Sequence, residues 1–155
     1  MPEYLKEFPE QQDVLRYVLT ATAPETKDND FTWKDFQARN NNELVAIYGN
    51  FINRVLVLTH KYYGGQVPSL TVLNSTDAAI FKLLKETPIA LQSSLERFRF
   101  REASQLIMNL ARSGNKYLAD EEPWKLIKTN PDRVQTIMNV ALQLAAGISV
   151  LSEPF

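Results

Sequence analysis

The chain contains 155 residues, with 17 Lys and Arg against 18 Asp and Glu, one histidine and no cysteine. A length near 150 residues is typical of one compact domain. The lack of cysteine excludes a disulfide framework, a thiolate nucleophile and a Cys-ligated zinc or iron–sulfur site. A net charge of −1 argues against holding nucleic acid through a broad basic surface, although it allows recognition of a few bases.

The first half of the chain shows helical periodicity interrupted by one polar loop. A short amphipathic helix is predicted from Glu10 to Ala21, and a loop from Ala23 to Phe31, which holds four charged residues and no apolar period. A long helix is then predicted from about Trp33 to Tyr62. Its stretch from Leu44 to Thr59 contains one charged residue, so we expect this stretch to be buried on nearly every side as the central helix of the domain.

The second half begins with a helix end and a loop. Gly64 and Gly65 predict the end of the long helix, and residues 66–74 predict a loop. Two shorter helices are expected next. Residues 75–77 offer an N-cap to the first, and Thr87-Pro88 offers a cap to the second with proline at its first position.

The remaining residues predict further helices. Residues 99–119 carry apolar side chains at helical spacing, residues 120–124 break the pattern, and residues 129–132 cap a last helix. Because such helices are joined by short connections, we expect an all-α antiparallel helix bundle. We see no apolar run long enough to cross a membrane and no signal peptide, which favours a soluble, cytoplasmic protein.

No catalytic motif is present in the sequence. Phosphate-binding, dinucleotide-binding, serine-hydrolase and zinc-protease patterns are all missing. The acid pairs Asp28/Asp30 and Glu121/Glu122 lie in predicted loops, where solvated charge is a simpler interpretation than acid–base catalysis. The lone His60 lies near a helix end, where a surface or capping role is more common than metal ligation.

Two places are not explained by a simple helical core. Asn50 and Arg54 are four residues apart, so their side chains lie on one face of the long helix and reach a common partner. A charge on a mostly buried helix costs several kcal/mol, in order of magnitude, unless it is paired. From this stretch alone we favour Arg54 bonded to a neighbouring carboxylate or helix C-terminus over a functional role.

The second place is Pro123-Trp124, at the break between two predicted helices. A tryptophan that opens a helix after a proline more often packs into the core than remains exposed. The alternative is an exposed indole on which a nucleic-acid base stacks.

Three segments together resemble methionyl-tRNA synthetase, a class I enzyme family that attaches methionine to its tRNA. The resemblance covers essentially the whole chain and rests on DVLRYVLTATAPETKDNDFTWKDF (13–36), NNELVAIYGNFINRVLVLTHKYYGG (41–65) and NKYLADEEPWKLIK (115–128). It implies an antiparallel bundle of the class I synthetase anticodon-binding type. In that family an Asn and an Arg on the first long helix and the Trp of a Pro-Trp motif contact the CAU anticodon.

The residues at the matching positions are Asn50, Arg54, Pro123 and Trp124, so the resemblance places them at one RNA-binding site. Tryptophan offers a flat face to an unstacked base, and the Asn and Arg side chains offer hydrogen bonds to base edges. Some members carry a further Asn one turn earlier, where this chain has Ala46, so that contact is not expected here.

The resemblance also implies a piece of a longer enzyme. Residues 1–32 resemble the end of its catalytic half, and residues 33–155 resemble the anticodon-binding bundle, which we expect to be truncated at its C-terminus. The family's ATP-handling motifs, zinc-binding cysteines and methionine pocket are absent, so this chain is expected to be catalytically inactive and to bind no cofactor.

The expected partners are the anticodon loop of methionine tRNA and the catalytic half of the parent enzyme, which would use ATP and, in many members, zinc. We expect this chain to be monomeric and to have no membrane partner. The alternative function is a helical protein-interaction or scaffold domain in which Arg54 and Trp124 are structural.

Overall fold

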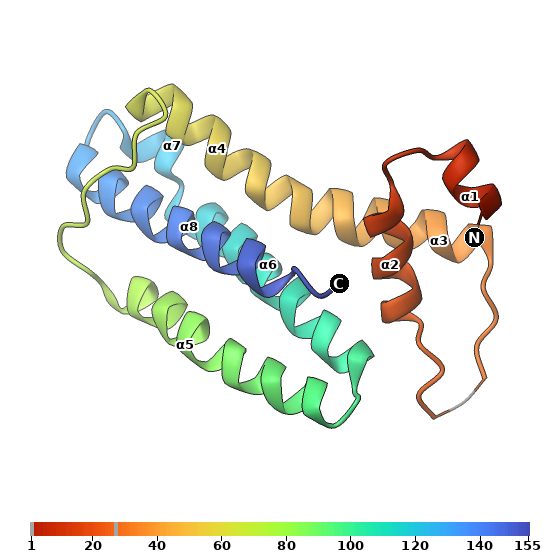
Figure 1. The fold of residues 1–155 in the computed structure, drawn as a ribbon. Helices are drawn as coiled ribbons and strands as arrows, with labels where there is room; N and C mark the ends of the chain where they lie inside the picture. Colours follow the sequence, from red (N-terminus) through yellow and green to blue (C-terminus); the bar gives the residue numbers. More distant parts are fainter. Residues whose placement is uncertain (1, 27) are drawn as a thin grey trace.

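The structure is a computed structural model that describes residues 2–26 and 28–155. These described residues form helices and loops without a strand, which confirms the predicted all-α fold (Figure 1). In chain order the helices are α1 (Pro2–Glu7), α2 (Gln12–Ala21), α3 (Trp33–Arg39), the π-helix η1 (Asn40–Gly49), α4 (Asn50–Tyr63), α5 (Ser75–Glu96), α6 (Phe100–Glu121), α7 (Pro123–Leu126) and α8 (Pro131–Leu151).

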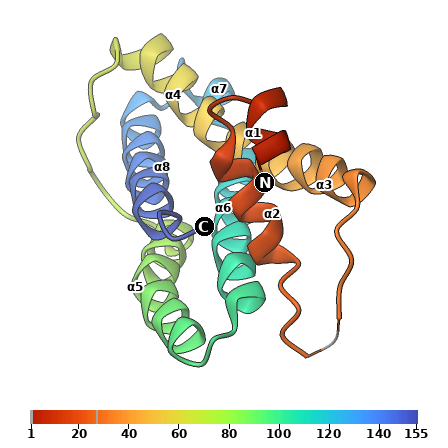
Figure 2. The same cartoon turned by 45° about the vertical axis from the view of Figure 1, so that its right-hand side comes forward.

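The helices α4, α5, α6 and α8 form the bundle, and α8 contacts each of the other three. A short turn joins α5 to α6, which run antiparallel (Figure 2). The N-terminal α2 packs against α6 and η1 at the end of the bundle opposite α7. The predicted antiparallel bundle is therefore present.

The central helices are α6 and α8, each with nine buried residues, rather than the stretch from Leu44 to Thr59, so that prediction is wrong. In the α4 part of that stretch, Phe51, Val55 and Thr59 are buried, and they follow the i, i+4, i+8 spacing of a single stripe. On other sides Leu56 and Val57 are 48% and 53% exposed. A low charge content did not imply burial all round, because α4 lies at the edge of the bundle.

Judged only by its length and composition, the helix α8 is long and apolar enough to cross a membrane. Its apolar character has a local explanation, because nine of its residues are buried against the rest of the bundle. It begins as predicted, with the Asn130 side chain accepting a hydrogen bond from the Arg133 backbone and Pro131 in the first turn.

The two short helices predicted around Thr87-Pro88 are one continuous helix, α5, with Pro88 in its interior. Its N-cap is Asn74, whose side chain and backbone exchange hydrogen bonds with Asp77 in a capping box. Pro88 removes one backbone donor, but it is exposed on the solvent-facing side of α5, so no packed neighbour opposes its ring. The prediction that a new helix begins at Thr87-Pro88 is therefore wrong.

The N-terminal helix predictions also need correction at their bounds. The first predicted helix begins at Gln12 rather than Glu10, which has a positive φ of 66°. The additional helix α1 precedes it and was not predicted. The predicted loop from Ala23 to Phe31 is confirmed in the residues that the structure describes there, and Lys27 lies outside them.

The long helix predicted from Trp33 to Tyr62 is continuous, but ten of its residues form the π-helix η1 between α3 and α4. A π-helix is rare and is frequently found at functional sites. At its end the backbone N–H of Asn50 donates to the carbonyls of Ile47 and Val45, where the hydrogen-bond register returns to that of an α-helix. The helix ends at Gly64 in the left-handed conformation, as predicted.

A buried ion network joins the beginnings of α5 and α8 to the end of α6. The Asp77 carboxylate is fully buried and accepts hydrogen bonds from the Arg133 guanidinium at 2.9 Å and from the Tyr117 hydroxyl at 2.6 Å. Arg133 also pairs with Glu121 at 2.7 Å. Glu121 was predicted to be a solvated loop charge, which is wrong because its side chain closes this network.

The network determines the ionisation of its members. Burial alone raises the pKa of Asp77, but hydrogen bonds from Arg133, Tyr117 and the Asn74 backbone outweigh burial and hold that pKa below its ordinary value. Burial and the bond to Asp77 raise the pKa of the Tyr117 hydroxyl, which keeps it a donor. The ionised carboxylate is therefore the form that the folded state stabilises.

Packing around Gly114 gives a first prediction. A Cβ atom at Gly114 would lie 2.5 Å from the Phe51 ring, which is fully buried and unable to move aside. Gly114→Ala should therefore lower the free energy of unfolding by about 1–3 kcal/mol, although alanine ordinarily stabilises a helix. Urea titration followed by circular dichroism measures this change.

The matched control is Gly147→Ala in α8, where the added Cβ would meet only the terminal Cδ2 of Leu84, at 2.6 Å. A flexible side-chain end gives way more easily than a buried ring, so we expect a smaller loss. Equal losses for the two variants would contradict the packing argument.

The ion network gives a second prediction. Asp77→Asn removes one charge from a buried pair and should destabilise the chain on the order of 3 kcal/mol near neutral pH. Because the folded pKa of Asp77 is lowered, its contribution is present above the pKa of the unfolded state and is lost as the pH falls through the folded value. Unfolding titrations at pH 7 and at several values below about 4 should show the wild-type advantage narrowing with acid.

The control variant is Asp120→Asn, which breaks the exposed pair between Asp120 and Lys116. Such surface pairs contribute about 0–1 kcal/mol. A difference between wild type and Asp77→Asn that stays constant from pH 7 to pH 2 would contradict the assignment.

Candidate nucleic-acid interface

The short helix α7 is held rigidly at the junction of α6 and α8. Glu122 ends α6 in the left-handed conformation, with φ 44°, which is costly for a residue other than glycine. Its side chain pairs with Lys125 at 2.7 Å, and its carbonyl accepts from the Lys125 backbone at 2.8 Å. Pro123 opens α7 and is buried. The indole that follows therefore projects from a fixed backbone.

Trp124 and Arg54 lie in direct contact across two helices. The Trp124 side chain is 38% exposed, so it is not the fully buried core residue of the structural alternative. The guanidinium carbon of Arg54 lies 5.2 Å from the centre of the indole ring, in a cation–π arrangement. Within the described residues Arg54 has no carboxylate partner. The carboxylate or helix C-terminus that the sequence favoured as the partner of Arg54 is therefore not found in this part of the chain, and the indole lies against Arg54 instead.

Asn50 occupies the first position of α4, one helical turn before Arg54. It is exposed, and its side-chain amide donates to Oδ1 of Asn115 on α6 at 3.0 Å. The structure therefore brings Asn50, Arg54 and Trp124 to one side of the bundle, from α4 and α7. Sequence reasoning assigned no role to Asn115, although it opens the third motif that carried the resemblance.

The charges near Trp124 are largely compensated. Each of the three consecutive acids before Pro123 has a cation within 2.7 Å, in the pairs Asp120–Lys116, Glu121–Arg133 and Glu122–Lys125. In the described part of the chain, Arg54, Lys61 and Lys128 take part in no ion pair. The acidic run therefore does not dominate the field at this end of the bundle, where uncompensated cations remain.

Neither the sequence nor the described structure offers a metal site. No group of three or more His, Cys, Asp or Glu side chains in residues 2–26 and 28–155 is placed to hold a metal ion. His60 is exposed, and its ring packs against Gly65: a Cβ atom added to Gly65 would lie 2.9 Å from Cε1 of His60. The zinc expected of the parent enzyme does not fit the residues present here. That this chain binds no cofactor stays a prediction.

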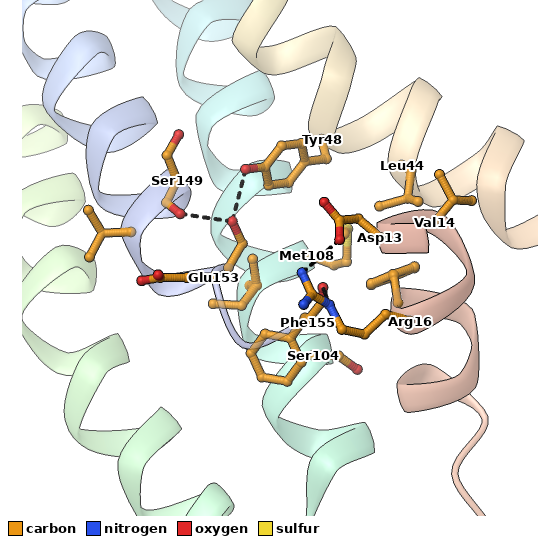
Figure 3. Close-up of a pocket in the computed structure, with 14 residues that line it drawn as sticks. Asp13, Val14, Arg16, Leu44, Tyr48, Ser104, Met108, Ser149, Glu153 and Phe155 are labelled. Atoms are coloured by element: carbon orange, nitrogen blue, oxygen red, sulfur yellow. Dashed lines mark hydrogen bonds and ion pairs between the residues drawn. The ribbon is translucent and has the colours of Figure 1, made fainter. Parts of the chain in front are cut away.

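A cavity of about 680 Å³ lies between α2, η1, α6 and α8, away from the predicted site residues (Figure 3). Its polar groups pair with one another, as in the hydrogen bond between Tyr48 and Ser152 at 3.0 Å and the ion pair between Arg16 and Asp13 at 2.9 Å. A separate open groove runs beside Asn50 and Asn53 along η1. Of the predicted site residues, Asn50 borders this groove.

Known proteins share both the sequence and the fold of this chain. Residues 1–56 match the family model of class I tRNA synthetases (M), and residues 67–155 match that of the anticodon-binding domain of methionyl tRNA ligase. The methionine–tRNA ligase of Christiangramia forsetii is 70% identical over 99% of this chain, and that of Flavobacterium johnsoniae is 66% identical over the same share. The chain spans 22% of the length of each of these relatives.

Solved structures give the same answer for the fold. The Mycobacterium tuberculosis methionyl-tRNA synthetase in complex with methionyl-adenylate superposes on 99% of this chain with a TM-score of 0.92, at 23% identity and over 31% of its own length. Its apo form superposes on 92% of this chain with a TM-score of 0.87. Because more than half of its residues match the family model, the chain belongs to the methionyl-tRNA ligase family and contains that family's anticodon-binding domain.

Proposed function

We propose that this chain binds the anticodon loop of methionine tRNA and reads the bases CAU by stacking and hydrogen bonding. The observation that carries the proposal is the contact between Arg54 and the half-exposed Trp124, with Asn50 one turn away on the same helix. Arg54 and Trp124 come from distant parts of the sequence, and in residues 2–26 and 28–155 Arg54 forms no ion pair that would explain its place beside the indole.

The chemistry of the three side chains suits single-stranded RNA. An unstacked base gains about 1–3 kcal/mol by stacking on an aromatic side chain, and an arginine guanidinium plane also accepts a stacked base. Because Arg54 already covers one face of the Trp124 ring, the stack would form on the remaining exposed indole surface or continue over the guanidinium. Asn50 would supply hydrogen bonds to a base edge.

The proposal extends to the longer protein by family membership. The relatives are named as ligases of methionine and tRNA, and this chain would supply the anticodon reading of such an enzyme while the catalytic half supplies ATP-dependent chemistry and further tRNA contacts. Catalytic inactivity, a monomeric state and a cytoplasmic location of this chain are part of the same proposal. The division at residue 33 also stays a prediction.

Loss of the indole should weaken RNA binding measurably. Trp124→Ala should reduce the affinity for an anticodon stem-loop carrying CAU by about 1–3 kcal/mol, roughly 5- to 150-fold. Isothermal titration or fluorescence anisotropy with a labelled stem-loop measures the change. A stem-loop with a changed anticodon tests whether the lost affinity is specific.

The chain offers a matched control in its other tryptophan. Trp33 is 55% exposed and begins α3, roughly 30 Å from Arg54 by the rise of the intervening helix. Trp33→Ala should leave stem-loop affinity unchanged. If wild type and Trp124→Ala bind CAU loops equally, and no better than loops with other anticodons, the proposed function is wrong.

The salt dependence should be shallow. With a net charge of −1 and few unpaired cations near Trp124, the site would neutralise about two or three phosphates, which gives a slope of log affinity against log salt of about −1.4 to −2.1 for single-stranded RNA. Binding measured from 50 to 300 mM salt tests this. A slope steeper than about −4 would indicate binding by bulk charge instead.

A further inference from the structure

We propose that Asn115 is a positioning residue that orients the Asn50 side chain, so that the Asn50 amide oxygen faces the RNA and accepts a hydrogen bond from the amino group of a cytosine or an adenine. The inference rests on the proposed function. It adds a residue that acts through Asn50, and it specifies the chemistry by which Asn50 selects a base.

The orientation of Asn115 follows from its partners. Its Nδ2 donates to the carbonyl oxygens of Ile47 at 2.9 Å and of Ala111 at 3.3 Å. Backbone carbonyls are acceptors only, so the opposite orientation would place the Asn115 oxygen against two other oxygens. Both hydrogens of Asn115 are thus committed, and its Oδ1 must face Asn50.

The position of Ile47 explains why this anchor is firm. Its carbonyl lies in the last turn of η1 and also accepts from the backbone N–H of Asn50, where the π-helix passes into α4. Asn115 therefore ties α6 to the point at which the hydrogen-bond register changes. The same amide that fixes the end of η1 also contacts the first side chain of α4.

The orientation of Asn50 follows in turn. Because Asn115 presents an oxygen, Asn50 must present its nitrogen, and the observed bond from Asn50 Nδ2 to Asn115 Oδ1 is 3.0 Å long. The Asn50 side chain is exposed, and its oxygen accepts no hydrogen bond within the described residues. A free acceptor therefore faces solvent beside Arg54, which offers donors alone.

This pattern distinguishes bases. Cytosine and adenine carry an amino group at positions 4 and 6, whereas uracil and guanine carry a carbonyl oxygen there. An amino group would donate to the Asn50 oxygen, and a carbonyl oxygen would face it without a hydrogen. Without Asn115 the Asn50 amide would be free to flip, so that it could bind a base with an amino group through its oxygen or a base with a carbonyl group through its nitrogen. Asn115 would then contribute to specificity rather than to contact area.

The test measures discrimination by the full 155-residue chain among stem-loops carrying CAU, UAU and CGU. Each changed loop replaces an amino group with a carbonyl oxygen, at the cytosine or at the adenine; the neighbouring ring nitrogen becomes a donor, and guanine also adds a 2-amino group. Wild type should prefer CAU over at least one of the others by about fivefold or more, and the loop that shows the preference identifies the base. Asn115→Leu should reduce that ratio to near one.

A second substitution separates positioning from structural damage. Asp at position 50 presents an acceptor in either orientation, so Asn50→Asp combined with Asn115→Leu should restore the preference for CAU even where overall affinity is lower. A structural defect at Asn115 would not be rescued by a change at the exposed Asn50. As a control on the same helix, Asn109→Leu removes another exposed amide and should leave the ratio unchanged.

Two further measurements keep the inference testable whatever the stability of Asn115→Leu. Asn50→Asp alone should lose the preference for CAU, because its carboxylate has no hydrogen to donate to the Asn115 oxygen and is repelled by it. The double variant, which lacks that oxygen, should regain the preference. In the free chain, one Asn50 side-chain proton should exchange slowly with solvent by nuclear magnetic resonance, and Asn115→Leu should abolish that protection.

The outcomes distinguish the two proposals. Full discrimination by Asn115→Leu, or full discrimination by Asn50→Asp alone, would overturn the positioning role and leave anticodon binding intact. Failure of the wild-type chain to prefer CAU over any changed loop would overturn the proposed function and this inference with it. Restored discrimination in the double variant supports both.

Discussion

The buried pair of Asp77 and Arg133 is the constraint on which the corner of the bundle beside α7 depends. Burying two charges is expensive, and a pair of apolar residues would often be as stable. Here the pair links three helices, because Arg133 of α8 also pairs with Glu121 of α6, and Tyr117 of α6 donates to Asp77 of α5. The starts of α5 and α8 are thereby bound to the end of α6, and the backbone that carries Trp124 leaves from that same point.

Much of the fold was predictable because its signals are local. The extent of the helix from Trp33 to Tyr63, its end at Gly64 and the Asn130 cap of α8 each depend on neighbouring residues. The errors arose where the tertiary packing of a helix, rather than its local sequence, determines the structure. Pro88 is tolerated because it lies on a solvent-facing side of α5, and α4 is half exposed because of its place at the edge of the bundle. Neither the solvent-facing position of Pro88 nor the edge position of α4 can be predicted from the neighbouring residues alone.

The candidate site was predictable only in part, for a related reason. The spacing of Asn50 and Arg54 identified one helical face, but their link to Trp124 came from a family resemblance rather than from any pattern. The contacts that join them span long separations in sequence, as the Asn50–Asn115 bond does over 65 residues. Asn115 sits at an ordinary helical position, and a polar residue there could as well be solvent-exposed. The positioning role proposed for Asn115 rests on its hydrogen bond to Ile47 at the end of η1.

Exposure of α4 at the edge of the bundle, which contradicted the expected burial, is what makes a rigid recognition surface possible. A helix buried on every side could present no side chain to a ligand, whereas a loop would present side chains that lose conformational entropy on binding. Here one stripe of α4, including Phe51 and Val55, is anchored in the core while Asn50 lies on an open side. If the proposed function holds, the order needed at the site is established during folding, and little of it has to be imposed when a base binds.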